Sequence, residues 1–462
     1  MKYLLKKNYS SLLQQPVNQI YTELQAVYKD AFADDERILF IDDIEDNSAK
    51  TNLENYLDKL LDHLDIDKFF IVTVNRGSQT IVNPTNYAIP DTICMTPWIG
   101  LEIDVDSSLH RCCLWDRQLG EDAISIIDYF SSNKQQELKQ QLLEGNKPTA
   151  CDKCWRVEDN GGISKRLNDE YVFREHKFNI DYNDLTSSKI LNLDIKLGNK
   201  CNLACRICSS RCSSTWSRYE KAQSVTFDWL DNESSTFWSD IISVSKDVRY
   251  ITFAGGEPLL DKTHRKLLQY FIDEGLSDQV TLHYNTNGTV FADFLFDYWD
   301  QFKTVELSFS IDAVGNRFMY ERFGSTWETV SANLQKYKDT DYVCNIYATV
   351  TNINIMYSDE VFKLANKLGM GITFSALSDP KELTVTNLPS IVKKSIRTKL
   401  MSVNDIEFKR QIQPILDIMY SKEGISSVRE YLVTQDFKRA THFKDYYPEL
   451  DMLLSEEQLN VS

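Results

Sequence analysis

The chain has 462 residues and a formal net charge of −17 at neutral pH. Its length allows two or three domains, and a hydrophobic share of 42% is enough for ordinary cores. So acidic a chain argues against a broad nucleic-acid surface, which needs a basic stripe. No run approaches the roughly 20 apolar residues of a membrane span, and the N-terminus lacks the apolar core of a signal peptide. We therefore expect a cytoplasmic protein that does not enter a membrane.

Residues 1–90 predict a small α/β module. Apolar runs at 37–43 and 69–74 are typical of strands, and they flank a helical pattern at 53–64. The segment contains no GxGxxG or P-loop motif, so it offers no phosphate cradle. We interpret it as a docking or structural module.

Residues 91–185 open with Cys94 and an alternating apolar run. A turn at 106–108 and a short strand that ends at Cys112 follow. This pattern predicts a β-hairpin that brings Cys94 and Cys112 together. Cys113 is either a spare thiol or a competitor for Cys112.

A CxxC pair, Cys151 and Cys154, follows a helical linker and can close a four-thiolate site. Ten cysteines are too sparse for a disulfide scaffold in a chain of this length, and most of them have the spacings of metal ligands. Such a site suits zinc as well as an iron–sulfur cluster.

Residues 186–378 alternate between strand and helix patterns. We expect helices at 263–274 and 327–337. The strand-like runs lie near 191–197, 249–254, 280–284, 305–311, 343–350 and 371–377. Alternation of this kind implies parallel strands with right-handed crossovers, and six units suggest an α/β fold with a partial (β/α)6 barrel. Chemistry in parallel barrels gathers at the C-terminal ends of the strands.

Residues 379–462 form a mostly helical C-terminal extension in this interpretation. Pro380, Pro389 and Pro414 are expected to break it into segments. The extension would cover the open side of the barrel.

A second set of cysteines directly follows the first barrel strand. Cys201, Cys205 and Cys208 have CxxxCxxC spacing. Electron-transfer clusters are commonly held by four thiolates, so three thiolates leave one iron of a cubane cluster open to a small molecule. A zinc site with a distant fourth ligand, or an accident of composition, is the alternative.

The next barrel strand ends in Gly255, Gly256, Glu257 and Pro258. Glycines let a ligand approach the backbone closely, and proline turns the chain out of the strand. Glu257 would then present a carboxylate acceptor that suits a ligand's ammonium group.

Together, these two motifs resemble the radical S-adenosylmethionine (radical SAM) enzymes. The resemblance implies a [4Fe–4S] cluster on Cys201, Cys205 and Cys208 that binds SAM through its fourth iron. It also implies SAM contacts from Gly255, Gly256, Glu257, Asn287, Ser310, Asp312 and Arg322. One departure is Ile207, since the family usually has an aromatic residue there, beside the adenine.

The first cysteine set resembles the twitch domain, a shortened SPASM domain that carries one auxiliary cluster. The resemblance implies a second, auxiliary [4Fe–4S] cluster on Cys94, Cys112, Cys151 and Cys154. Ser107 stands where the usual pattern has glycine. The module precedes the barrel here, whereas in relatives it usually follows.

The implied activity is reductive cleavage of SAM to methionine and a 5′-deoxyadenosyl radical, which removes hydrogen from a peptide, a protein or a small metabolite. The electron would come from a reductant such as flavodoxin or ferredoxin. Two other classes stay open: a non-catalytic iron–sulfur electron carrier and a zinc-stapled scaffold. No catalytic residue beyond the cofactor ligands is singled out.

Overall fold

The computed structural model forms two compact units, one of residues 1–94 with 136–167 and the other of 95–135 with 168–462. It describes residues 2–5, 37–42, 69–75, 78–82, 91–114, 125–159, 164–176, 178, 180–182, 184–186, 189–220, 237–422 and 428–460. Within these residues, no helix is both long and apolar enough to cross a membrane.

The first unit contains a four-stranded sheet in the order β1-β2-β3-β4. The strands are β1 (Lys2–Leu5), β2 (Arg37–Asp42), β3 (Phe69–Asn75) and β4 (Ser78–Val82). β1, β2 and β3 are parallel, as a β-α-β unit requires, and β4 returns antiparallel to β3. The helix expected at 53–64 lies outside the described residues. The unit also contains most of α6 (Asn133–Leu143), the 3-10 turn η3 (Thr149–Cys151) and α7 (Asp152–Asp159). The helix α8 (Lys165–Glu175) begins in this unit and lies mostly in the second.

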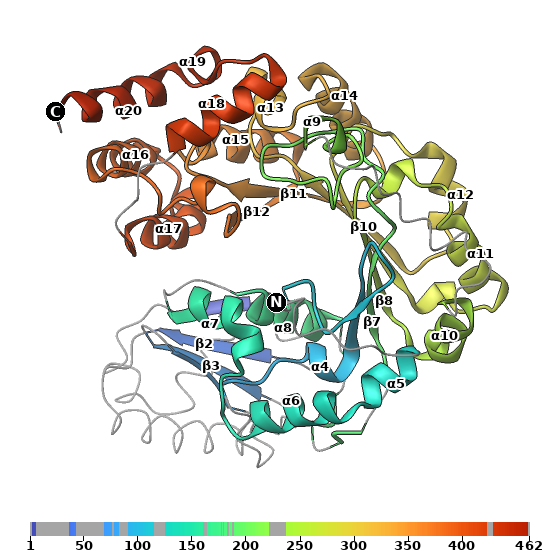
Figure 1. The fold of residues 1–462 in the computed structure, drawn as a ribbon. Coiled ribbons are helices and arrows are strands. Elements are labelled where there is room, and N and C mark those ends of the chain that lie inside the picture. The colour runs from blue at the N-terminus through green and yellow to red at the C-terminus, as the bar shows by residue number, and fades with distance from the viewer. Residues whose placement is uncertain are drawn as a thin grey trace, which may run out of the picture. The chain divides into compact units, whose positions relative to one another are not determined.

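The second unit contains an eight-stranded sheet in the order β12-β11-β10-β9-β8-β7-β5-β6 (Figure 1). Its strands are β5 (Gly100–Ile103), β6 (Leu109–His110), β7 (Asn192–Lys196), β8 (Tyr250–Ala254), β9 (Thr281–Thr286), β10 (Thr304–Ser310), β11 (Val343–Val350) and β12 (Gly371–Ala376). All neighbours are parallel except β5 and β6. No pairing among the described residues joins β12 to β6, so the sheet stays open. This confirms the predicted partial barrel of six parallel strands, β7 to β12.

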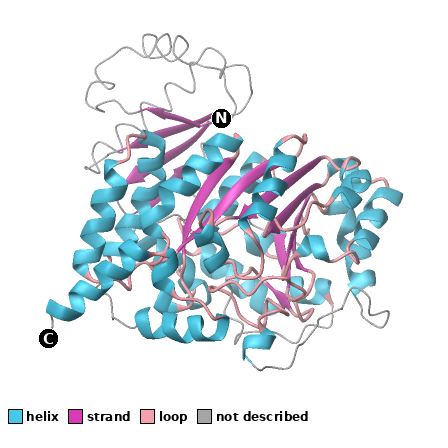
Figure 2. Ribbon diagram, turned by 90° about the horizontal axis from the view of Figure 1, so that it is seen from above, coloured by secondary structure: helices cyan, strands magenta, loops and turns pink. Residues whose placement is uncertain are grey.

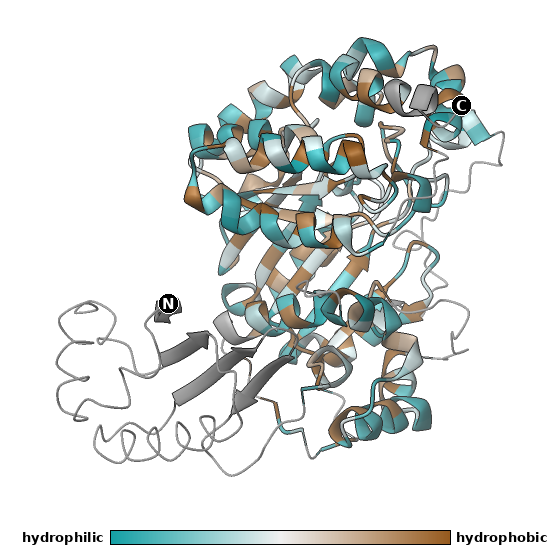
Figure 3. Cartoon of the chain, turned by 90° about the vertical axis from the view of Figure 1, so that its left-hand side faces the viewer, coloured by the Kyte–Doolittle hydropathy of each residue, from teal (hydrophilic) through white to brown (hydrophobic). Residues whose placement is uncertain are grey.

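Alternation along the strands places one face of this sheet in the core. In β10, Val305, Leu307 and Phe309 are buried, whereas the residues between them are only partly buried. The buried face packs with helices of the crossovers into one hydrophobic core. Helices flank the strands in Figure 2, and hydrophobic residues are frequent along the strands in Figure 3. The other face is free to carry polar side chains.

The crossovers of the barrel are helical, as expected. α11 (Arg265–Asp273) and α14 (Trp327–Lys338) are the two helices predicted from the sequence. Also between barrel strands lie α9 (Ser217–Glu220), α10 (Phe237–Val244), α12 (Phe296–Trp299), α13 (Asn316–Glu321) and α15 (Ser358–Leu368). Two short helices precede the barrel: α4 (Thr96–Ile99) and α5 (Ile126–Ser131). Short 3-10 turns are η4 (Ser245–Asp247), η5 (Pro258–Leu260), η6 (Ser277–Gln279), η7 (Asp293–Leu295), η8 (Ile355–Tyr357) and η9 (Lys381–Leu383).

The C-terminal extension is helical and has its own hydrophobic core, which includes residues of the last barrel crossover. Its helices are α16 (Ser390–Ser402), α17 (Ile406–Tyr420), α18 (Val428–Arg439), α19 (Phe443–Tyr446) and α20 (Pro448–Asn460). Pro389 caps the start of α16, as predicted. The break expected at Pro414 is wrong, because Pro414 lies inside α17. Ile415 and Leu416 are buried next to it, and this packing outweighs the lost backbone hydrogen bond.

The predicted hairpin is present as β5 and β6, with Glu102 opposite His110. Its first strand begins only at Gly100, because residues 96–99 form α4. Ser107 in its turn has a φ of 66°, the left-handed region that favours glycine. β5 also pairs with β7, so the hairpin extends the barrel sheet. This pairing explains why residues 95–135 group with the barrel in one compact unit.

Candidate functional site

The three closely spaced cysteines lie on the loop that directly follows β7, here named the cluster loop (residues 197–212). The segment after β8 supports this loop through backbone hydrogen bonds: the amide of Gly256 donates to Gly198 O at 2.8 Å, and that of Glu257 to Lys200 O at 2.8 Å. Gly255 has a φ of 113°, and a Cβ there would lie 2.5 Å from Gly198 O. In this structure the glycines therefore permit close approach of two backbone segments.

Cys201, Cys205 and Cys208 share this loop, and the amide of Cys208 donates to Cys205 O at 3.1 Å. Burial raises the pKa of the Cys201 thiol to about 12, and it also raises the pKa values of Cys205 and Cys208. The Arg322 guanidinium opposes this effect at Cys205, where its Nη1 lies 4.0 Å from Sγ. Metal binding must therefore displace thiol protons.

The donor chemistry fits a thiolate-bound cluster: three thiols share one loop, and a buried cation lies beside the second. In the side-chain placements of the described residues, no three His, Cys, Asp or Glu groups already stand at metal-binding distance. Cys212 lies on the same loop and was not predicted from the sequence: its amide donates to Ser209 O at 3.1 Å, and its charge raises the pKa of Cys208. Its signal was a fourth cysteine four positions after Cys208.

Glu257 is only 1% exposed, and its carboxylate ties the end of β8 to the end of β9. Oε1 accepts from the Leu259 amide at 3.1 Å and from Thr286 Oγ1 at 2.7 Å. Oε2 accepts from the Asn287 amide at 2.6 Å. Burial raises the pKa of Glu257 to about 7, against the effect of these hydrogen bonds. A carboxylate has about four acceptor positions, so roughly one is left for a ligand.

Asn287 faces the cluster loop. Its Nδ2 donates to Asn202 Oδ1 at 3.0 Å and lies 4.0 Å from Cys201 Sγ. Its Oδ1 accepts from the amide and the hydroxyl of Thr289. The side chain is therefore fixed beside the first cysteine of the loop.

The structure brings Asp312 and Arg322 together as a buried ion pair of 2.8 Å. Asp312 Oδ1 also accepts from the Thr349 amide at 2.8 Å. One buried donor of Arg322, Nε, has no hydrogen-bond partner among the described residues. A buried guanidinium with a spare donor suits an anionic group, as the sequence suggested for this arginine. Ser310 is the last residue of β10 and is partly buried at the same edge of the sheet.

The first cysteine set is divided between the two units. Cys94, Cys151 and Cys154 belong to the first unit, and Cys112, with Cys113, belongs to the second. Burial raises the pKa of the Cys154 thiol. Ile207 is partly buried and packs against the hydrophobic core that includes the C-terminal helices.

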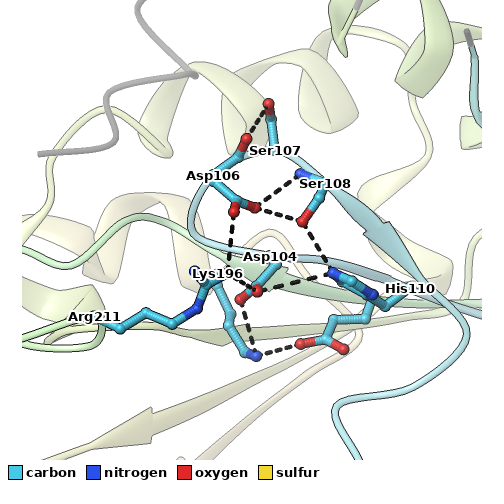
Figure 4. A network of polar contacts seen from close by, with 8 residues as sticks. Asp104, Asp106, Ser107, Ser108, His110, Lys196 and Arg211 are labelled. Atoms are coloured by element: carbon cyan, nitrogen blue, oxygen red, sulfur yellow. Dashed lines mark hydrogen bonds and ion pairs between the residues drawn. The ribbon is translucent and has the colours of Figure 1, made fainter. Parts of the chain in front are cut away.

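A charged network that the sequence analysis missed joins the β5–β6 hairpin to both ends of the cluster loop (Figure 4). Lys196, which ends β7, pairs with Glu102 and lies 3.1 Å from Asp104. Arg211 pairs with Asp104 at 2.6 Å and with Asp106 at 3.0 Å. Glu102 lies on β5 and Asp104 directly follows that strand, in a mostly apolar run whose pattern does not indicate a buried ion-pair partner on β7.

Comparisons with known proteins bear on the central part of the chain. Residues 195–365 match the family model of the Radical SAM superfamily. No match was found among curated proteins.

Several solved structures resemble the chain weakly. A structure of anSMEcpe with bound AdoMet and the Kp18Cys peptide has 18% identity and a TM-score of 0.33, over 40% of this chain and 50% of that one. The match thus spans about half of that protein. Streptococcus suis SuiB bound to S-adenosylmethionine has 14% identity and a TM-score of 0.33, over 70% and 65%. TYW1 with a lysine-pyruvate adduct has 14% identity and a TM-score of 0.28, over 46% and 72%.

The family match covers the cluster loop, the segment after β8 and the ends of β9 and β10. Residues 195–365 of this chain therefore form a radical SAM superfamily domain.

Proposed function

We propose that this chain is a radical SAM enzyme, an oxidoreductase that cleaves SAM and uses the product radical to remove hydrogen from its substrate. The observation that carries the proposal is the cluster loop itself. Three cysteines lie on the loop that directly follows β7. The segment after β8 holds the backbone of this loop through hydrogen bonds.

The cofactor pair, a [4Fe–4S] cluster with SAM, supplies the electron and the 5′-deoxyadenosyl radical. The chain's own contribution is placement. Cys201, Cys205 and Cys208 would hold the cluster, while Arg322 is suited to the SAM carboxylate and Glu257 to its ammonium group. The same SAM site would be lined by Gly255, Gly256, Asn287, Ser310 and Asp312.

The direct test is anaerobic reconstitution with iron and sulfide, followed by dithionite and SAM without substrate. We expect slow release of 5′-deoxyadenosine and methionine, because this background reaction needs only the barrel site. An electron carrier would bind iron without cleaving SAM, and a zinc-stapled scaffold would retain zinc and no iron. Either result would contradict the proposal.

We also propose a second, auxiliary [4Fe–4S] cluster on Cys94, Cys112, Cys151 and Cys154. Their spacing and the resemblance to the twitch domain support it. The loaded protein should then carry about eight irons, four per cubane cluster. A Cys151→Ala/Cys154→Ala variant should keep about half of them and retain the background cleavage. Tightly bound zinc at this site would contradict the second cluster and leave the first untouched.

The substrate is proposed as a peptide, a protein or a small metabolite, and the reductant as flavodoxin or ferredoxin. No feature of the described residues favours one of these substrate classes over the others. A test with each reductant in place of dithionite would separate the electron donors by the rate of 5′-deoxyadenosine release.

A further inference from the structure

The residues between the three cysteines are held by segments that lie far along the chain. The amide of Ala204 donates to Phe323 O at 2.7 Å, and the amide of Arg206 donates to Glu321 O at 2.8 Å. These two bonds attach the middle of the cluster loop to the end of α13. They fix one edge of its backbone.

The backbone carbonyls of Ala204, Cys205 and Arg206 all accept hydrogen bonds as well. Ala204 O accepts from Arg439 Nη2 at 2.9 Å. Cys205 O accepts from Trp216 Nε1 at 2.7 Å, and Arg206 O accepts from the Tyr431 hydroxyl at 3.3 Å. Arg439 in turn lies over the Trp216 ring, 4.5 Å from its centroid. Two of the three donors thus come from α18.

The side chain of Arg206 completes the attachment. It is 1% exposed, and its Nη2 donates to Asp436 Oδ1 and to Thr441 Oγ1, each at 2.8 Å. Its Nε donates to Tyr320 O at 2.9 Å. Asp436 Oδ2 accepts from the Phe443 amide at 2.6 Å, so the carboxylate is itself held in place. A buried charge pair of this kind is costly to break from either side.

We propose that α18 and the turn after it are a working part of the cluster site: Asp436, Arg439 and Tyr431 are positioning residues that keep the cluster loop in its ligand-ready shape. All three lie beyond residues 195–365, the part that matches the family model. The proposal rests on the proposed function only in assigning the cluster to this loop.

The physical reason is that groups which orient a metal's ligands control its retention. Loss of such a partner typically changes metal affinity or activity by roughly 10- to 100-fold. With three consecutive carbonyls bound, the loop's peptide planes cannot rotate independently, so the backbone that carries the cysteines stays in one conformation. Without α18, the loop must be ordered by the metal alone.

The test uses the full chain in two states. For the reconstituted protein, the rate of iron loss to a chelator is measured, together with the electron paramagnetic resonance spectrum. For the apo-protein, the rate of Cys205 alkylation is measured against that of Cys344 on β11. The variants are Asp436→Asn and Tyr431→Phe, and the matched control is Phe437→Ala, because Phe437 is on the same helix and 90% exposed.

We expect Asp436→Asn to lose iron on the order of tenfold faster and to show an altered spectrum. Its Cys205 should react faster while Cys344 keeps its rate. Tyr431→Phe should show the same changes at roughly threefold, the scale of one neutral hydrogen bond. Phe437→Ala should match the wild type.

Equal acceleration at Cys205 and Cys344 would mean that α18 only stabilises the fold, and it would overturn the proposal. So would wild-type behaviour in Tyr431→Phe, which decides the matter if Asp436→Asn does not fold. If the wild type binds no iron, the proposed function fails. The alkylation rates then still decide whether α18 holds the loop.

Discussion

The two ends of the cluster loop and its middle are held in different ways. The ends are held by ion pairs: Lys196 and Arg211 pair with Glu102 and Asp104 of the β5–β6 hairpin. The middle is held by hydrogen bonds to consecutive backbone carbonyls, given by Arg439, Trp216 and Tyr431. Ion pairs tolerate changes in geometry, whereas bound carbonyls fix peptide planes. The hairpin should therefore contribute to folding stability, and the C-terminal helices to cluster retention.

The largest expected effect on stability is that of Asp104→Ala. Asp104 is 1% exposed and serves both Lys196 and Arg211, so its loss leaves two cations with fewer partners. We expect the free energy of unfolding to fall by about 3 kcal/mol, as for a buried pair that loses one partner. Denaturant unfolding of the apo-protein measures it.

The control for this change is Asp106→Ala on the same hairpin. The Asp106 side chain is 35% exposed, and its one ion pair among the described residues is with the more exposed Arg211. Its loss should therefore cost about 1 kcal/mol or less. Equal costs for the two variants would contradict the picture of a buried pair at the ends of the loop. A large rise in the rate of iron loss with Asp104→Ala would contradict the assignment of cluster retention to the middle of the loop alone.

The next effect concerns Glu257, whose amide also supports the start of the cluster loop. If its carboxylate accepts from SAM, Glu257→Gln should weaken SAM binding about ten- to a hundredfold, since a charge-assisted hydrogen bond is worth roughly 1.5–3 kcal/mol. The cluster spectrum should be unchanged. Equilibrium binding of SAM to the reconstituted protein measures this.

Thr286→Val provides the matched variant, because it removes one internal donor to Glu257 and keeps the charge. It should lower the free energy of unfolding without a comparable loss of SAM affinity. If the two variants weaken SAM binding equally, Glu257 acts only by joining the ends of β8 and β9.

The smallest expected effect lies in the hairpin turn. Ser107 has a left-handed φ of 66°, so Ser107→Gly should relieve backbone strain and raise the free energy of unfolding by about 0.5 kcal/mol. Ser108→Gly is the contrasting change. Because the Ser108 hydroxyl donates to Asp106, its loss should lower the free energy of unfolding. Destabilisation by Ser107→Gly would mean that its hydroxyl, which donates to Asp106 O, matters more than its backbone.

The barrel was predictable because its signals are local. Six apolar runs predicted β7 to β12 within a few residues, and the motifs at their ends fall on one edge of the sheet. The cysteines of the cluster loop could likewise be recognised from their spacing alone. Ser107 could be recognised as a turn residue, although its left-handed conformation needed the structure.

The contacts that hold the site were not predictable, because they join residues far apart in the chain. Arg206 and Asp436 are separated by 230 positions, and no local pattern links a basic residue between two cysteines to a late helix. Asp312 and Arg322 were each expected to contact the cofactor, but their ion pair with each other was not predicted. Pro414 shows the same limit for helices, since tertiary packing decides whether a proline ends one.

The most direct test of the account is a comparison of two cysteine variants after anaerobic reconstitution. One replaces Cys201, Cys205 and Cys208 with alanine, and the other is Cys212→Ser, which changes the neighbouring thiol of the same loop. We predict that the triple variant loses about four irons and all release of 5′-deoxyadenosine, whereas Cys212→Ser keeps both. Full iron content and SAM cleavage in the triple variant would contradict the assignment of the cluster to this loop.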